Sequence, residues 1–179
     1  MIRLLLPFVV GTGWLVLETV VIGFFPRHYP PPDVVLILVI MFGFRYTPSV
    51  GGPVSFLLGL LQDALAGGTL GVCALSKTVV YAITTSMARR FYFSTIIAKI
   101  GMVLLGGIVD AVAGILLLSI GGFSQSISAV THYQMLKVLL TGLLAPLVLE
   151  ATTRVFALVE RRDKAAYDYG SKEARTRRT

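Results

Sequence analysis

The chain is divided into long apolar runs, and these limit it to one class of fold. Four runs, residues 4–25, 72–87, 96–120 and 136–159, approach the length that a helix needs to cross a bilayer, which is roughly 20 residues. The shortest, 72–87, is expected to begin near Leu70. Charged residues make up only 14% of the chain, against roughly 25% in a typical soluble domain. The sequence therefore predicts an all-α, polytopic membrane protein.

Two shorter apolar runs, residues 34–44 and 50–61, lie between the first two long ones and are separated by a turn that contains Arg45. Runs of about 10 to 14 residues fit either full spans or a re-entrant hairpin. We favour two spans, because Pro32 is well placed to begin one helix and the other can extend to Ala66. About six transmembrane helices follow. A hairpin would leave four, and both termini would still lie on one side.

Lys and Arg residues set the expected orientation. With the N-terminus inside, the cytoplasmic side holds Arg3, Arg45, Arg89, Arg90, Lys99 and the C-terminal tail, and the outer side holds Arg27 and Lys137. Basic residues favour the cytoplasm, so we expect an inner-membrane protein with both termini cytoplasmic. The net charge of +7 then reflects membrane topology, and no nucleic-acid partner is expected.

The connections and the tail have distinct compositions. Residues 25–32 are rich in proline and are expected to form an extended outer connection, and residues 121–132 form a polar outer segment rich in Gly and Ser. Residues 1–160 are predicted to form the transmembrane domain. Residues 161–179 are predicted to form a basic cytoplasmic tail, disordered after a frayed helix end.

Ionisable side chains within the predicted spans need an explanation, because each costs about 2.5 to 3.5 kcal/mol at a helix centre. They are Glu18, Asp63, Lys77, Asp110 and Glu150. Four acids and one lysine cannot all pair with each other. Some are therefore expected to be protonated, to lie near headgroups or to meet a partner protein.

Individual partners can be suggested for some of these groups. Asp110 fits a protonated acid hydrogen-bonded to a neighbouring helix, or a proton relay or transport site. Lys77 can extend to the outer headgroups or pair with Asp63. Glu150 and Arg154 are four residues apart and are predicted to form an intrahelical ion pair.

Small residues recur at every fourth position in two of the predicted helices. The first series is Gly51, Ser55, Gly59, Asp63 and Gly67, and the second is Gly106, Asp110 and Gly114. Such spacing places small residues on one face and lets another backbone approach closely. The face is expected to pack within the chain or against a helix of another membrane protein.

Motifs of known enzyme classes are missing from the sequence. It contains no GxSxG, P-loop or HExxH pattern, and Cys73 is its single cysteine. We therefore expect no catalytic residue, no cofactor and no metal site. An intramembrane hydrolase that used Asp63 with Asp110 is a less favoured alternative.

The segment GLLQDALAGGTLGVCAL, residues 59–75, resembles the MreD family of rod shape-determining membrane proteins. The family typically shows G-L-x-x-D-x-x-x-G-x-x-G after its third helix. The matching residues are Gly59, Leu60, Asp63, Gly67 or Gly68, and Gly71. Further matches are the Pro32-Asp33 helix start, the basic turn at Arg45 and the basic pair Arg89 and Arg90. Lys77 and the long basic tail depart from the family pattern, so the resemblance assigns them no role.

The resemblance implies a non-enzymatic scaffold of the bacterial elongation machinery. Such a protein binds the bitopic partner MreC and helps couple MreB filaments to the peptidoglycan synthases RodA and a class B penicillin-binding protein. Its basic cytoplasmic surface can also meet anionic lipid.

The family also resembles the helical bundle of energy-coupling-factor substrate subunits, so a substrate-binding transporter subunit is the alternative function. Such a subunit usually has polar and aromatic side chains in the outer half of the bundle. Those halves are mostly Leu, Val and Ile here, with Trp14 as the single tryptophan. This composition favours the scaffold.

Overall fold

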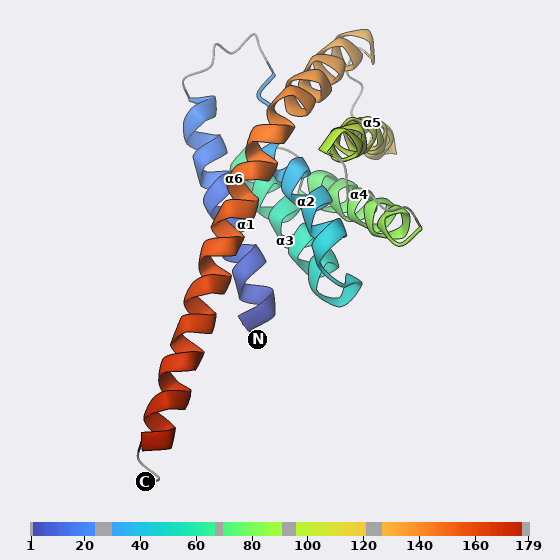
Figure 1. The fold of residues 1–179 in the computed structure, drawn as a ribbon. Coiled ribbons are helices and arrows are strands. Elements are labelled where there is room, and N and C mark those ends of the chain that lie inside the picture. Colours follow the sequence, from blue (N-terminus) through green and yellow to red (C-terminus); the bar gives the residue numbers. More distant parts are fainter. Residues whose placement is uncertain (1, 24–29, 67–69, 91–95, 121–126, 177–179) are drawn as a thin grey trace. The chain divides into compact units, whose positions relative to one another are not determined.

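The computed structural model describes residues 2–23, 30–66, 70–90, 96–120 and 127–176. Within these ranges the chain forms six helices and no strand, as the sequence predicted (Figure 1). The helices are α1 (Ile2–Ile22), α2 (Val34–Arg45), α3 (Pro48–Ala66), α4 (Val72–Ala88), α5 (Ile96–Ile120) and α6 (Ile127–Thr176).

The two short apolar runs form separate helices, and local capping explains where they begin and end. Asp33 is the N-cap of α2 and accepts a hydrogen bond from the Leu36 N–H at 2.9 Å. After α2, the Thr47 carbonyl accepts the N–H groups of Val50 and Gly51, both at 2.9 Å. The chain therefore reverses within a few residues, and α3 begins at Pro48, a residue suited to the first turn of a helix.

Among the residues that the structure describes, three segments are long and apolar enough to cross a membrane by themselves: Pro48–Ala66, Ala98–Leu116 and His132–Leu158. The segments Leu5–Val20, Val34–Arg45 and Val72–Ala88 are apolar but shorter. The fold is thus that of a helical membrane protein, and a count of six passes remains a prediction.

The last helix differs from its predicted bounds at both ends. α6 already begins at Ile127, inside the predicted outer segment 121–132, and it continues past Glu160 to Thr176. Residues 127–132 contain no Gly or Pro, and the region after Glu160 is rich in Ala, Lys and Arg. These are strong helix formers, which explains the longer helix. Residues 121–126 and 177–179 lie outside the described residues.

Contacts divide the chain into two units, Met1–Pro146 and Leu147–Thr179, with the boundary inside α6. The predicted division at residue 160 into a membrane domain and a disordered tail remains a prediction. In the second unit Arg154 Nε lies 3.0 Å from Glu150 Oε1, so the predicted intrahelical pair is confirmed. Both side chains are mostly exposed, and such a pair adds little stability.

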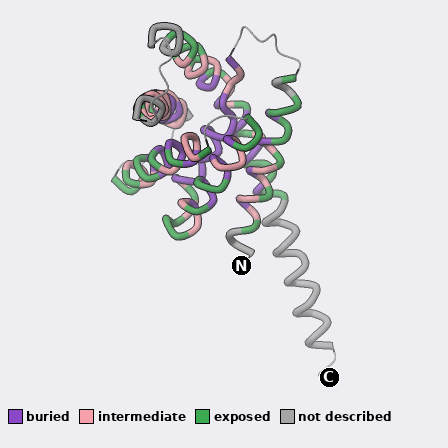
Figure 2. Tube along the Cα trace, turned by 180° about the vertical axis from the view of Figure 1, so that it is seen from behind, coloured by how far each residue is buried: buried purple, intermediate pink, exposed green. Residues whose placement is uncertain are grey.

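In the first unit α4 packs against α2, α3 and α5, and α1 packs against α2 and α3. Every residue of α2 from Val34 to Gly43 is buried (Figure 2). A 12-residue helix is only about 18 Å long, shorter than the hydrocarbon layer of about 30 Å. Its apolar surface is covered by the neighbouring helices instead of lipid, as expected for a helix that is apolar on all sides.

Candidate functional site

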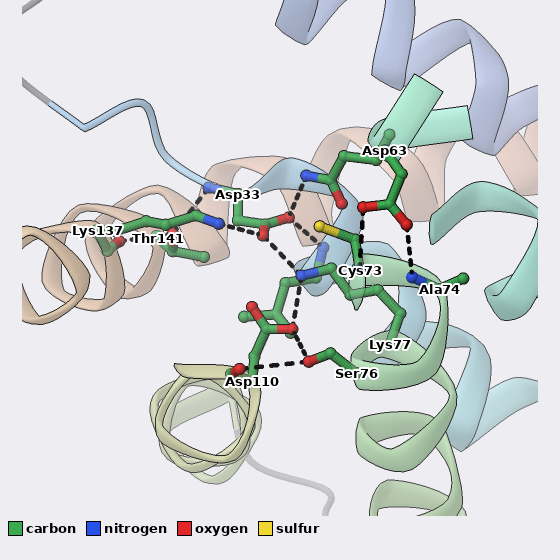
Figure 3. A network of polar contacts seen from close by, with 11 residues as sticks. Asp33, Asp63, Cys73, Ala74, Ser76, Lys77, Asp110, Lys137 and Thr141 are labelled. Atoms are coloured by element: carbon green, nitrogen blue, oxygen red, sulfur yellow. Dashed lines mark hydrogen bonds and ion pairs between the residues drawn. The ribbon is translucent and has the colours of Figure 1, made fainter. Parts of the chain in front are cut away.

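Polar side chains from five segments of the first unit lie close together (Figure 3). Asp33 precedes α2, Asp63 lies in the last turn of α3, and Lys77 lies in the second turn of α4. Asp110 comes from the middle of α5 and Lys137 from the first half of α6. Six polar side chains of these segments are connected by ion pairs and hydrogen bonds, and we call them the polar network: Asp33, Ser76, Lys77, Asp110, Lys137 and Thr141. Asp63 lies beside the polar network and has partners of its own.

Asp33 is the centre of the polar network. Its Oδ2 atom accepts Lys77 Nζ at 2.7 Å and Lys137 Nζ at 2.8 Å. Its Oδ1 atom accepts the Leu36 N–H that begins α2, and its own backbone N–H donates to Thr141 Oγ1 at 2.8 Å. One carboxylate therefore joins the start of α2 to α4 and α6.

Lys77 connects this centre to α5. Its Nζ lies 2.9 Å from Asp110 Oδ1 in addition to its contact with Asp33. The Ser76 hydroxyl also donates to Asp110 Oδ1. Asp33 and Lys77 are each 1% exposed, so a buried lysine is shared by two carboxylates on different helices.

The charges of the polar network balance. Two carboxylates, Asp33 and Asp110, face two ammonium groups, Lys77 and Lys137. A buried charge is tolerated when it is paired and hydrogen-bonded. The arrangement therefore accounts for four ionisable side chains inside an apolar bundle without a bound ion.

Asp63 caps the neighbouring helix. Its Oδ2 accepts the N–H groups of Gly71 at 2.8 Å and Ala74 at 3.3 Å, and its Oδ1 accepts the Cys73 N–H at 3.1 Å. Gly71 has φ +99°, a left-handed conformation that suits glycine. Asp63 therefore caps the start of α4 through three backbone N–H groups, and Gly67 and Gly68 of the same motif lie outside the described residues.

The small residues of α3 face α4. Gly51, Ser55 and Gly59 are buried, and a Cβ added at Gly59 would lie 2.5 Å from Ala74 Cα. On α5, a Cβ at Gly106 would meet Ile40 at 2.7 Å, whereas one at Gly114 would meet nothing within 4 Å. Gly51, Ser55, Gly59 and Gly106 are therefore packed within the chain, whereas Gly114 is open.

Glu18 lies beside the polar network and lines the same cavity as Lys137. It lies near the end of α1 and is 8% exposed, and its Oε2 has no hydrogen-bond partner among the described residues. It lines a cavity of about 450 Å³ together with Gln62, Cys73 and Lys137. This cavity lies next to the polar network, because Lys137 belongs to both.

The structure changes the pairing inferred for the intramembrane charges. Lys77 pairs with Asp33 and Asp110, not with Asp63 or the headgroups. Asp110 does bond a neighbouring helix, but as the partner of Lys77 and Ser76.

Asp33 was noted as a helix start and Lys137 as an outer residue, so sequence reasoning missed both as members of the site. The available signal was an Asp directly before an apolar run.

Chemical alternatives can be checked against these contacts. In the described part of the chain, no group of three His, Cys, Asp or Glu side chains could hold a metal ion. Asp63 accepts three backbone N–H groups, while Asp110 contacts Lys77 and Ser76. The two carboxylates thus have different partners, which argues against their use as a catalytic pair.

Comparison with known proteins identifies the family. The family described as rod shape-determining protein MreD matches residues 1–154, a range that contains the complete polar network and Asp63. No curated protein and no solved structure matches the chain, so the likeness to energy-coupling-factor substrate subunits remains a prediction. The family match covers most of the sequence, and the chain belongs to the MreD family of rod shape-determining proteins.

Proposed function

We propose that this chain is a non-enzymatic scaffold of the bacterial elongation machinery. It would bind an MreC-like bitopic protein in the inner membrane and help couple MreB filaments to RodA and a class B penicillin-binding protein. The observation that carries the proposal is the family match over residues 1–154. The balanced charges of the polar network support it, because they act as a structural connection between helices.

The proposed partner surface is the exposed face of α1. Val9, Val16 and Val20 are exposed there, and a Cβ added at Gly13 on the same helix would meet nothing within 4 Å. Gly59, in contrast, is already occupied by α4. A small residue on an open apolar face suits close approach by a partner helix.

The experiment is co-purification of an MreC-like protein from mildly solubilised membranes, together with rescue of rod shape in cells that lack this chain. We expect Gly13→Leu to reduce both, since the added side chain would hold the partner helix away. Gly114→Leu on α5, where the glycine is equally open, shows whether the effect is specific to the α1 face. Absence of co-purification and of rescue by the wild-type chain would reject the scaffold.

One observation favours a second candidate, a substrate-binding subunit of an energy-coupling-factor transporter. The cavity of about 450 Å³ lies in the size range of small-molecule sites, roughly 300 to 1,000 Å³. Equilibrium binding to a panel of vitamins separates the two functions. We expect no saturable binding, and micromolar affinity for any vitamin would favour the transporter.

A further inference from the structure

The cavity beside the polar network lies at the ends of several helices. Glu18 is near the end of α1, Gln62 and Leu65 are near the end of α3, and Cys73 is in the first turn of α4. Tyr133, from the start of the apolar part of α6, also lines it. Spanning helices leave the hydrocarbon at their ends, so the cavity lies close to the level of the lipid headgroups.

Two of the residues that line this cavity, Glu18 and Gln62, each have a buried acceptor atom without a partner among the described residues, Glu18 Oε2 and Gln62 Oε1. Gln62 Nε2 lies 3.4 Å from Asp33 Oδ1. Because the Asp33 carboxylate can only accept, the Gln62 amide presents its nitrogen there and keeps its oxygen free. A ligand that satisfies both atoms has to donate hydrogen bonds.

The charge balance narrows the ligand further. The polar network contains two carboxylates and two ammonium groups, so an ionised Glu18 beside it adds one uncompensated negative charge. A buried carboxylate needs a positive partner or a proton. One primary ammonium supplies a single positive charge and three N–H donors.

The rim of the cavity has a basic side chain and exposed apolar side chains, which suit the phosphate and the acyl chains of a phospholipid. Lys137 is 22% exposed, and its contact with Asp33 uses one of its three N–H donors. Tyr133 and Leu65 are exposed at 46% and 55%. The charge of Lys137 is already balanced within the polar network, so a phosphate at this exposed rim would remain hydrated and accept a hydrogen bond from Lys137. Acyl chains can lie along the apolar surface around Leu65.

We propose that this cavity binds the headgroup of a phospholipid with a primary ammonium, such as phosphatidylethanolamine. The ammonium contacts Glu18 and Gln62, and the phosphate lies beside Lys137. A soluble amine offers the same ammonium but has no phosphate or acyl chains, and the experiment separates these two sources.

The test measures lipid binding to the purified, delipidated chain by native mass spectrometry. Phosphatidylethanolamine, its N-methylated forms and phosphatidylcholine are compared with identical acyl chains. The ammonium of phosphatidylethanolamine can donate charge-assisted hydrogen bonds, whereas the quaternary amine of phosphatidylcholine has no N–H group. We therefore expect phosphatidylethanolamine to bind about tenfold more tightly. Each added N-methyl group should lower binding, and this series needs no protein variant.

Glu18→Gln should remove the preference for the primary ammonium. Glu150→Gln is the matched control, because Glu150 is exposed and pairs with Arg154 in the second unit. Equal binding of the N-methylated series by the wild-type chain would overturn the proposal. If an equal concentration of ethanolamine displaces the lipid, the ligand of this cavity is a soluble amine and the phospholipid is rejected.

Discussion

At the scale of single residues, Lys77 is the side chain on which the polar network most depends. It is 1% exposed and holds Asp33 and Asp110 on either side. Lys77→Met would leave these two carboxylates with Lys137 as their remaining cation. Removing one partner of a buried ion pair costs about 3 to 5 kcal/mol. We expect the free energy of unfolding in detergent to fall by about that amount, measured by thermal or chemical denaturation.

The double variant Lys77→Met/Asp110→Leu tests the cause of this loss. It leaves Asp33 paired with Lys137 at 2.8 Å, so the remaining charges balance again. The double variant should therefore be more stable than Lys77→Met alone. Lys99→Met on α5 is the control outside the network and should change little. If Lys77→Met and wild type unfold at the same midpoint, the network adds no stability.

The residue scale also shows what sequence could and could not predict. The Asp63 cap was predictable, because Gly71 follows it within a short loop and the contact is local in sequence. The Lys77 pairing was not, because Asp33 and Asp110 lie 44 and 33 residues away. Those partners depend on which helices pack next to one another. The apolar runs of the sequence do not show which helices are neighbours.

At the scale of helices, α3 and α4 approach each other closely at Gly59. A Cβ there would lie 2.5 Å from Ala74 Cα and 2.7 Å from the Cys73 carbonyl oxygen. Both contacts are with backbone, so the two helices would have to separate even for alanine. Gly59→Ala should lower the free energy of unfolding by about 1 to 3 kcal/mol, the usual cost of overpacking, and Gly59→Leu should lower it further.

The matched control for Gly59→Ala is Gly52→Ala on the same helix. There the added Cβ would lie 3.9 Å from Tyr81, an ordinary contact. Denaturation should show little change for Gly52→Ala. A Gly59→Ala protein as stable as the Gly52→Ala control would mean that α3 and α4 are not packed this closely.

Helix bounds were largely predictable from sequence, because Pro, Gly and Arg separate the apolar runs. The expected run 96–120 agrees with α5, Ile96–Ile120. The ends of α6 were less predictable. The Gly- and Ser-rich composition of residues 121–132 suggested a loop, but residues 127–132 have adequate helix propensity and belong to α6.

At the scale of the whole chain, the open question is whether α2 and α3 cross the membrane. The turn between them lies beside the second half of α4, because the Tyr81 hydroxyl donates to the Tyr46 carbonyl at 3.1 Å. A Cβ at Gly43 would also lie 2.7 Å from Thr84. The turn therefore lies near the end of α4, where Arg89 and Arg90 are exposed. A re-entrant hairpin would leave the exposed Arg45 within the hydrocarbon, at a cost of about 2.5 to 3.5 kcal/mol.

We therefore predict that this turn is cytoplasmic. In a Cys73→Ala background, Thr47→Cys should react with a membrane-impermeant maleimide only after the inner membrane is opened, because Thr47 is exposed and basic residues favour the cytoplasmic side. A reporter active only in the cytoplasm should give signal after Met87 or Arg162 and none after His28. Labelling of Thr47→Cys from outside, or activity after His28, would reverse the orientation. Protection of Thr47→Cys even in opened membranes would indicate the re-entrant hairpin, and the chain would then cross the bilayer four times.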